Sequence, residues 1–133
     1  MGNLKPGLTG EKVIVVEQGN TASHLGSGGV PVFATPMMIL AMEEAALGAV
    51  DKFLEPGQAT VGYHLDVKHI AATPVGMRVT AKAELLAADG KMLTFRVEAF
   101  DEKEKIGEGT HVRAVIALDK FREKMAKKAA RQT

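Results

Sequence analysis

The hydrophobic pattern between residues 36 and 53 predicts one long helix. Apolar side chains there cover most of the helical circumference rather than one stripe, which is typical of a helix wrapped by other elements. Thr35 followed by Pro36 predicts an N-cap and a proline in the first turn, so we expect the helix to run from Pro36 to Phe53. Glu-Pro-Gly at residues 55–57 ends it, because proline and glycine do not continue a helix.

The regions on both sides of this helix favour strands, since apolar and polar residues mostly alternate there. Asp89-Gly90 and residues 101–105 are typical of tight turns, which join consecutive strands in antiparallel order. A Gly-rich stretch at residues 19–31 predicts a loop. The expected strands are Val13–Val16, 61–68, 77–85, Met92–Phe100 and Gly107–Leu118.

One long helix wrapped by an antiparallel sheet of about five strands is the outline of a hotdog fold, which belongs to the α+β class. We expect a single domain over residues 1–133, with a short basic helix or tail at residues 119–133. Because few helices are available to cover the sheet, an edge or face is left for another chain, and we expect a homodimer. The helix N-terminus is then the candidate ligand site, since concave sites favour interfaces.

The absence of cysteine narrows the possible chemistry. With no thiol among 133 residues, a disulfide scaffold, a cysteine-ligated metal and a cysteine nucleophile are excluded. We expect neither a metal nor a cofactor. No apolar run approaches the roughly 20 residues that a membrane span needs, and the first residues lack the apolar core of a signal peptide. We therefore expect no membrane partner and a cytoplasmic location.

The positive charge is concentrated at the C-terminal end. Residues 120–133 hold six Lys or Arg and one acidic residue, so this segment carries +5 and the rest of the chain −4. Nucleic-acid binders more often present basic charge on the folded body, with aromatic residues for single strands, and only 5% of this chain is aromatic. We expect no nucleic-acid partner.

The period-two pattern separates the histidines. His69 shares the phase of the apolar residues of its strand and is expected on the apolar side, whereas His64 is expected to point to water. A histidine on an apolar face is either a hydrogen-bonded core residue or a catalytic base, and the pattern leaves both open. The direction of His111 is also open, because its strand is apolar on both faces.

The helical period separates the two neighbouring acids in the same way. Glu43 falls among apolar residues and Glu44 on the polar side, so Glu43 is the better buried candidate. A carboxylate there suits a general base, although pairing with a cation explains it equally well. Thr35 has a simple explanation as the N-cap, yet free N–H groups at a helix start can stabilise an oxyanion, and those of Met37 and Met38 are the expected donors. Thr35 and Glu43 are separated by about 12 Å of helix rise, so they would bracket a site.

Four segments, in order, resemble the fluoroacetyl-CoA thioesterase family of hotdog proteins. They are V-F-A-T-P…M-E-E (32–44), F-L-E-P-G (53–57), V-G-Y-H-L-D-V-K-H-I-A-A-T-P-V-G (61–76) and G-E-G-T-H-V-R-A-V-I (107–116). The resemblance covers nearly the whole chain and implies a dimeric hydrolase that cleaves short acyl-CoA thioesters without a metal. It places the threonine, glutamate and histidine of the family at Thr35, Glu43 and His69. It also places a glycine and an arginine near the acyl pocket, at Gly62 and Arg113.

The expected function is therefore hydrolysis of a small acyl-CoA thioester to a free acid and coenzyme A at a dimer interface. Two routes stay open: attack by Thr35 with His69 as base, or action of Glu43 on the carbonyl, directly or through a water. A hotdog hydratase is a weaker alternative, because its Asp/His pairing on one short segment is not evident. From a different class, the alternative is a non-catalytic acyl-CoA-binding hotdog domain, which binding without turnover would favour.

Overall fold

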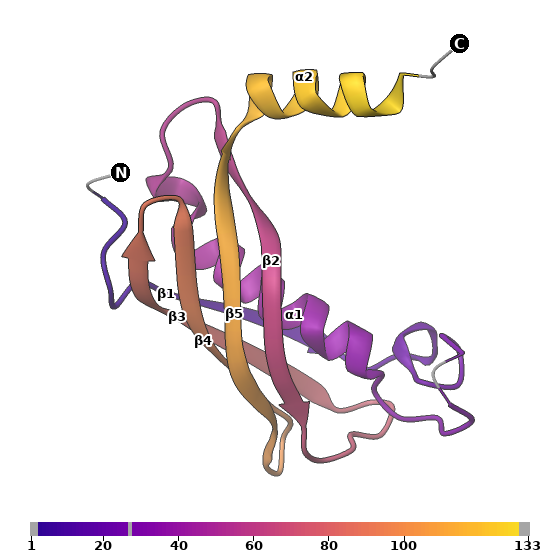
Figure 1. Ribbon diagram of the computed structural model, residues 1–133. Coiled ribbons are helices and arrows are strands. Elements are labelled where there is room, and N and C mark those ends of the chain that lie inside the picture. Colours follow the sequence, from indigo (N-terminus) through magenta and orange to yellow (C-terminus); the bar gives the residue numbers. More distant parts are fainter. Residues whose placement is uncertain (1–2, 27, 131–133) are drawn as a thin grey trace.

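A five-stranded antiparallel sheet curls around one long helix, α1, as the sequence predicts (Figure 1). The computed structural model describes residues 3–26 and 28–130. The strand order β1-β3-β4-β5-β2 leaves β1 and β2 at the two edges of the sheet. In chain order the elements are β1 (Thr9–Val15), η1 (Gln18–Asn20), α1 (Thr35–Val50), η2 (Asp51–Phe53), β2 (Gln58–His69), β3 (Arg78–Asp89), β4 (Met92–Phe100), β5 (Lys105–Ala117) and α2 (Leu118–Ala129).

The largest differences from the predicted boundaries are in two strands: β1 begins at Thr9 rather than Val13, and β3 continues to Asp89 rather than ending at residue 85. The start of α1 differs by one residue, and this difference bears on the site. Thr35 is not the N-cap: Ala34 takes that position with an extended backbone, and Thr35 is the first helical residue. The Thr35 hydroxyl is therefore not used for capping and is available to another partner. The helix ends at Val50, and the predicted continuation to Phe53 is a separate 3₁₀ turn.

The core lies between α1 and the inner face of the sheet, and small residues let the two approach closely. Seven residues of α1 are buried there: Met38, Ala41, Met42, Ala45, Ala46, Ala49 and Val50. The closest approach is at Gly10 of β1, where a Cβ atom would overlap the carbonyl oxygen of Ala45 and lie 2.7 Å from the backbone nitrogen of Ala49. Only glycine fits at this crossing without a shift of the backbone.

β2 is a free edge strand that exposes apolar side chains. Tyr63 is 70% exposed and Leu65 is 39% exposed, although the sequence pattern places both on the apolar side. That prediction is wrong for the single chain, because a bulge between Gly62 and His64 shifts the register with β5, and no strand in the described part of the chain pairs with the other edge of β2. At the end of the same strand His69 is half-buried, while His64 is exposed, as predicted.

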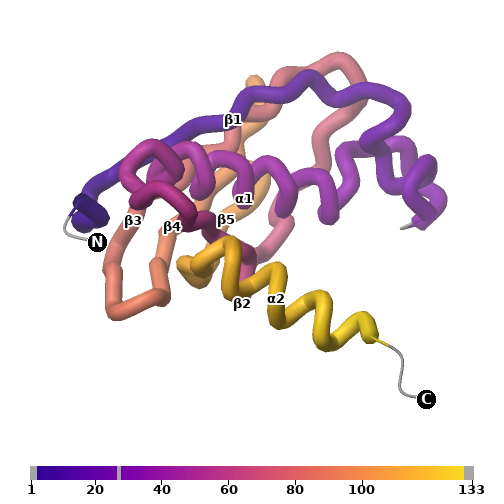
Figure 2. Tube along the Cα trace, turned by 90° about the horizontal axis from the view of Figure 1, so that it is seen from above, coloured from indigo at the N-terminus to yellow at the C-terminus, as the bar shows by residue number. Residues whose placement is uncertain are grey.

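The C-terminal helix α2 extends away from the sheet after β5, and Figure 2 shows it leaving the body of the molecule. Its first residue is anchored by a hydrogen bond of 2.9 Å from the Leu118 nitrogen to the Gly57 carbonyl oxygen. None of the residues of α2 is buried. The helix is basic, as predicted, while residues 131–133 of the predicted tail lie outside the described residues. No helix in the described part of the chain is long and apolar enough to span a bilayer.

Candidate active site

Thr35 and His69 form a hydrogen-bonded pair at the start of α1. The Oγ1 atom of Thr35 lies 2.7 Å from Nδ1 of His69, and the two residues are 34 positions apart in the chain. They meet because the last residue of β2 reaches the first turn of the helix. Both line an open pocket of about 300 Å³, together with Ala22, Val32, Phe33, Ile70, Ala71 and Ala72.

The His69 imidazole is suited to accept the proton of Thr35. Burial lowers the pKa of His69, and the backbone of Ala71 opposes part of this effect. The ring is therefore neutral at neutral pH and carries one N–H group. In the tautomer that accepts at Nδ1 from the Thr35 hydroxyl, the ring proton lies on Nε2, which is buried and has no hydrogen-bond partner among the described residues. In this arrangement the histidine can act as the base of the threonine.

A second polar cluster lies farther along α1, around the guanidinium of Arg113. Its Nε donates to the hydroxyl of Thr60 at 2.8 Å, and its Nη2 donates to the Thr60 carbonyl oxygen at 3.1 Å. Its Nη1 lies 3.1 Å from Nε2 of His111 and 3.9 Å from Oε2 of Glu43. Gly62 borders the same space, because a Cβ atom there would lie 2.8 Å from Oε2 of Glu43. The structure thus brings Glu43, Gly62 and Arg113 together.

Glu43 does not join the Thr35–His69 pocket of its own chain. It is absent from the lining of that pocket, and the ion pair of its carboxylate is with Arg113. The cause is the helix itself, since eight residues correspond to about 12 Å along the axis. The Glu43 side chain is 30% exposed and that of Glu44 is 42% exposed, which agrees with the predicted order of burial.

The expected oxyanion donors are not free. The backbone nitrogens of Met37 and Met38 both donate to the carbonyl oxygen of Ala34, at 3.0 and 3.1 Å. The expectation assumed that Pro36 is the first helical residue, whereas the helix begins one residue earlier and its first-turn hydrogen bonds already use these two groups. The Met38 side chain is buried and faces Gly107 in the sheet.

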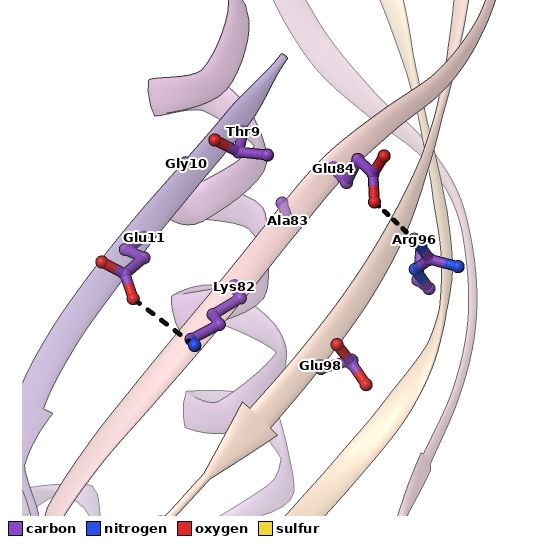
Figure 3. A pocket seen from close by; sticks show the side chains of 8 residues that line it. All are labelled: Thr9, Gly10, Glu11, Lys82, Ala83, Glu84, Arg96 and Glu98. Carbon is purple, nitrogen blue, oxygen red and sulfur yellow. Dashed lines mark hydrogen bonds and ion pairs between the residues drawn. The ribbon is translucent and has the colours of Figure 1, made fainter. Parts of the chain in front are cut away.

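A larger hollow of about 610 Å³ lies elsewhere, on the outer face of β1, β3 and β4 (Figure 3). Four of its five charged side chains pair with one another, Lys82 with Glu11 and Arg96 with Glu84, and the fifth, Glu98, pairs with Lys105. Exposed, mutually paired charges are typical of a solvated sheet face. The smaller pocket at the start of α1 is the better candidate, because it contains a hydroxyl held against an imidazole.

Sequence reasoning missed Thr60 and left the direction of His111 open. The structure buries His111 completely, with its ring stacked on Phe95 at 6.2 Å between centroids. A signal was present in the sequence: His111 and Arg113 are two residues apart in one strand and therefore share a face. A buried arginine also needs hydrogen-bond acceptors, and a neutral histidine and a threonine nearby can supply them. No group of three or more His, Cys, Asp or Glu among the described residues is placed to hold a metal ion.

Comparisons with known proteins agree on one family. The sequence matches the family described as fluoroacetyl-CoA-specific thioesterase over residues 16–119. A relative from Streptantibioticus cattleyicolor, named fluoroacetyl-CoA thioesterase, is 47% identical over 97 residues, which are 73% of this chain and 70% of the relative. A solved fluoroacetyl-CoA thioesterase is 39% identical with a TM-score of 0.88, covering 96% of this chain and 98% of its own. A hot-dog-like protein from Thermanaerovibrio acidaminovorans is 18% identical with a TM-score of 0.90, covers 98% of this chain and 97% of its own, and supports the fold alone.

Proposed function

Because this chain belongs to the fluoroacetyl-CoA-specific thioesterase family and is an acyl-CoA thioesterase, we propose that it hydrolyses a short acyl-CoA through Thr35, Glu43 and His69. The observation that carries the proposal is the distance of 2.7 Å between Thr35 Oγ1 and His69 Nδ1. A hydroxyl held against a neutral imidazole at this distance is typical of a nucleophile and its base. The pocket beside the pair is open to a ligand.

In the first route the nucleophile is Thr35. His69 Nδ1 takes the hydroxyl proton while Oγ1 attacks the thioester carbonyl carbon, and the C–S bond breaks to release coenzyme A as its thiol. Water then hydrolyses the threonyl ester, with His69 as base, and the free acid leaves. The hydrogen bond between Thr35 and His69 supports this route, since it joins the two groups that must exchange the proton.

The second route uses the carboxylate of Glu43. In direct attack, the carboxylate adds to the carbonyl carbon, the C–S bond breaks to release coenzyme A, and water then hydrolyses the resulting mixed anhydride to the free acid and Glu43. As a general base, Glu43 instead takes a proton from a water that attacks the same carbon, and the C–S bond breaks to release coenzyme A as its thiol. In both cases Thr35 and His69 hold the carbonyl oxygen. The half-exposed carboxylate beside Gly62 supports this route. Single-turnover hydrolysis in ¹⁸O-labelled water distinguishes the two: label in the Glu43 side chain supports direct carboxylate attack, and an ester on Thr35 supports the first route.

A homodimer formed through β2 would bring the two clusters together. The free edge of β2 spans 12 residues and exposes Tyr63 and Leu65, and Leu40 of α1 is 45% exposed. Antiparallel pairing of two β2 strands about a two-fold axis would cover these apolar side chains and continue the sheet. The two α1 helices would then run antiparallel, so that the Thr35–His69 end of one copy approaches Glu43 of the other. The separation of about 12 Å within one chain is then no obstacle.

Lysine at the exposed edge should prevent this association. We expect the wild type to have about twice the chain mass of 14.1 kDa by light scattering, and Leu65→Lys to shift toward the mass of one chain. Val13→Lys is the matched control, because Val13 of β1 is 50% exposed and lies in the strand at the opposite edge of the sheet. A wild type that stays monomeric at high concentration would contradict the proposed interface.

Thiol release from a panel of short acyl-CoAs tests the function directly. We expect hydrolysis of at least one of acetyl-, fluoroacetyl- and propionyl-CoA, with free coenzyme A and the acid formed in equal amounts. Binding of these esters without any thiol release would overturn the hydrolase and favour the non-catalytic acyl-CoA-binding domain. A panel of this kind also ranks the acyl groups.

The pH dependence should reflect the protonation of His69. Burial lowers the pKa of His69 from its ordinary value of 6.5, and only the neutral ring accepts the Thr35 proton. We therefore expect kcat/KM to be constant near neutral pH and to decrease only below pH 6.5, as the folded-state pKa is approached from above. A rate profile over about pH 5 to 8, with circular dichroism to show that the fold persists, measures this. A midpoint above 6.5 would contradict the assignment.

A further inference from the structure

His111 is the most deeply buried titratable side chain near the proposed site, and the mechanism above does not use it. Its Nδ1 lies 3.0 Å from the carbonyl oxygen of His64, which can only accept a hydrogen bond. Nδ1 therefore carries the proton, and Nε2 is the acceptor. The guanidinium of Arg113 donates to this Nε2 from Nη1 at 3.1 Å.

These contacts fix Arg113 from three directions. Thr60 accepts from Nε through its hydroxyl and from Nη2 through its carbonyl oxygen, and His111 accepts from Nη1. A guanidinium has five N–H groups, so two remain after these three bonds. Nη1, which keeps one of them, lies 3.9 Å from Oε2 of Glu43, and this oxygen is 2.8 Å from the position that a Cβ atom of Gly62 would take.

We propose that His111 is a positioning residue for the acyl group: together with Thr60 it holds Arg113 so that the remaining N–H group of Nη1 lies beside Glu43 and Gly62. The inference rests on the proposed function, because it assigns a role in acyl recognition within the same site. A guanidinium fixed by protein acceptors loses little freedom when it donates to a ligand, which is how preorganised donors give selectivity.

The role of His111 requires a neutral ring, since a protonated imidazole donates from both nitrogens and cannot accept from Arg113. Burial lowers the pKa of His111, with Arg113 acting in the same direction and Glu43 opposing. These two are the charged groups that act on the ring, Arg113 from β5 and Glu43 from α1. From β4 the ring meets Phe95, and from β2 it meets the backbone carbonyl of His64.

The test compares acetyl-CoA and fluoroacetyl-CoA, which differ only in one C–H or C–F group and so probe the polar side of the acyl pocket. His111→Phe keeps the stacking on Phe95 and removes the acceptor, so the ratio of kcat/KM for the two thioesters should change on the order of tenfold. His111→Gln places an amide oxygen near the position of Nε2 and should retain most of the wild-type ratio. Thr60→Val removes a different acceptor of the same guanidinium and should act like His111→Phe.

The pH dependence of this ratio separates His111 from His69. Protonation of His69 slows both thioesters alike and cancels in the ratio, whereas protonation of His111 releases Arg113 and alters it. The ratio should therefore change below pH 6.5 in the wild type and stay constant in His111→Gln. Thr110→Val, an exposed neighbour in β5, is the control and should leave both ratio and stability unchanged.

Folded His111→Phe and Thr60→Val proteins with the wild-type ratio at every pH would overturn the inference, while the hydrolase itself would stand. If the wild type releases no thiol, the proposed hydrolysis is wrong, and the two thioesters are compared by their dissociation constants instead. If the ratio of these constants in His111→Phe and Thr60→Val is the same as in the wild type, the inference is overturned as well. Thermal unfolding of each variant verifies that the comparison is made on folded protein.

Discussion

Glu43→Gln is expected to lower kcat/KM by about 10²-fold or more for any thioester that the protein hydrolyses. Glutamine has nearly the same size and still reaches the space beside Gly62, but it has no negative charge to act as base or nucleophile. Both chemical routes lose activity, since in the threonine route the carboxylate also balances the charge of Arg113, 3.9 Å away. Thiol release under single-turnover conditions measures the loss without interference from product release.

The neighbouring acid provides a matched control for this experiment. Glu44 is more exposed and pairs with Lys12 at 3.7 Å on the outer side of α1, so Glu44→Gln should stay within about twofold of wild type. Equal losses in the two variants would indicate a general effect on the helix rather than a specific role of Glu43. Wild-type activity in Glu43→Gln would remove this residue from the mechanism.

Gly10→Ala should have the largest effect on stability, lowering the free energy of unfolding by about 3 kcal/mol. The added methyl group would overlap the carbonyl oxygen of Ala45 and lie 2.7 Å from the nitrogen of Ala49. Both are backbone atoms of α1, so no side chain can rotate out of the way. Either β1 moves off the helix or the helix bends, and each loses packing across the core.

Urea unfolding of Gly10→Ala and Gly48→Ala measures this effect with an internal comparison. Gly48 is a residue of α1 itself, and a Cβ atom there would meet open space. Alanine at this position should raise the free energy of unfolding by about 0.5–1 kcal/mol, because it favours the helix over the unfolded chain. A Gly10→Ala protein as stable as wild type would show that the crossing of β1 and α1 is looser than described.

Local periodicity predicted the elements well, because it records which side chains face the core. The period-two pattern found β4 with its observed limits, and it distinguished half-buried His69 from exposed His64. The 3.6-residue period likewise ranked Glu43 as more buried than Glu44. These features depend only on the direction of a side chain from its own element.

That pattern does not predict contacts between segments that are distant in the sequence. The partner of the Thr35 hydroxyl is His69, and a helix-cap preference, which depends on nearby residues alone, assigned the hydroxyl to the helix instead. Arg113 and Thr60 are 53 positions apart and meet only through the pairing of β2 with β5. The exposure of Tyr63 was also not predicted. The pattern shows that an apolar side chain favours burial, but it does not show whether its own chain or a second copy buries it.

The loose attachment of α2 affects how the protein responds to proteases. No residue of this helix is buried, and lysine and arginine recur along it, so an enzyme that cuts after basic residues reaches it while the sheet stays closed. Loss of residues 120–133 changes the net charge from +1 to −4. Trimming would thus reverse the sign of the charge on an otherwise intact fold, and the clipped form would bind an anion-exchange column that the whole chain passes.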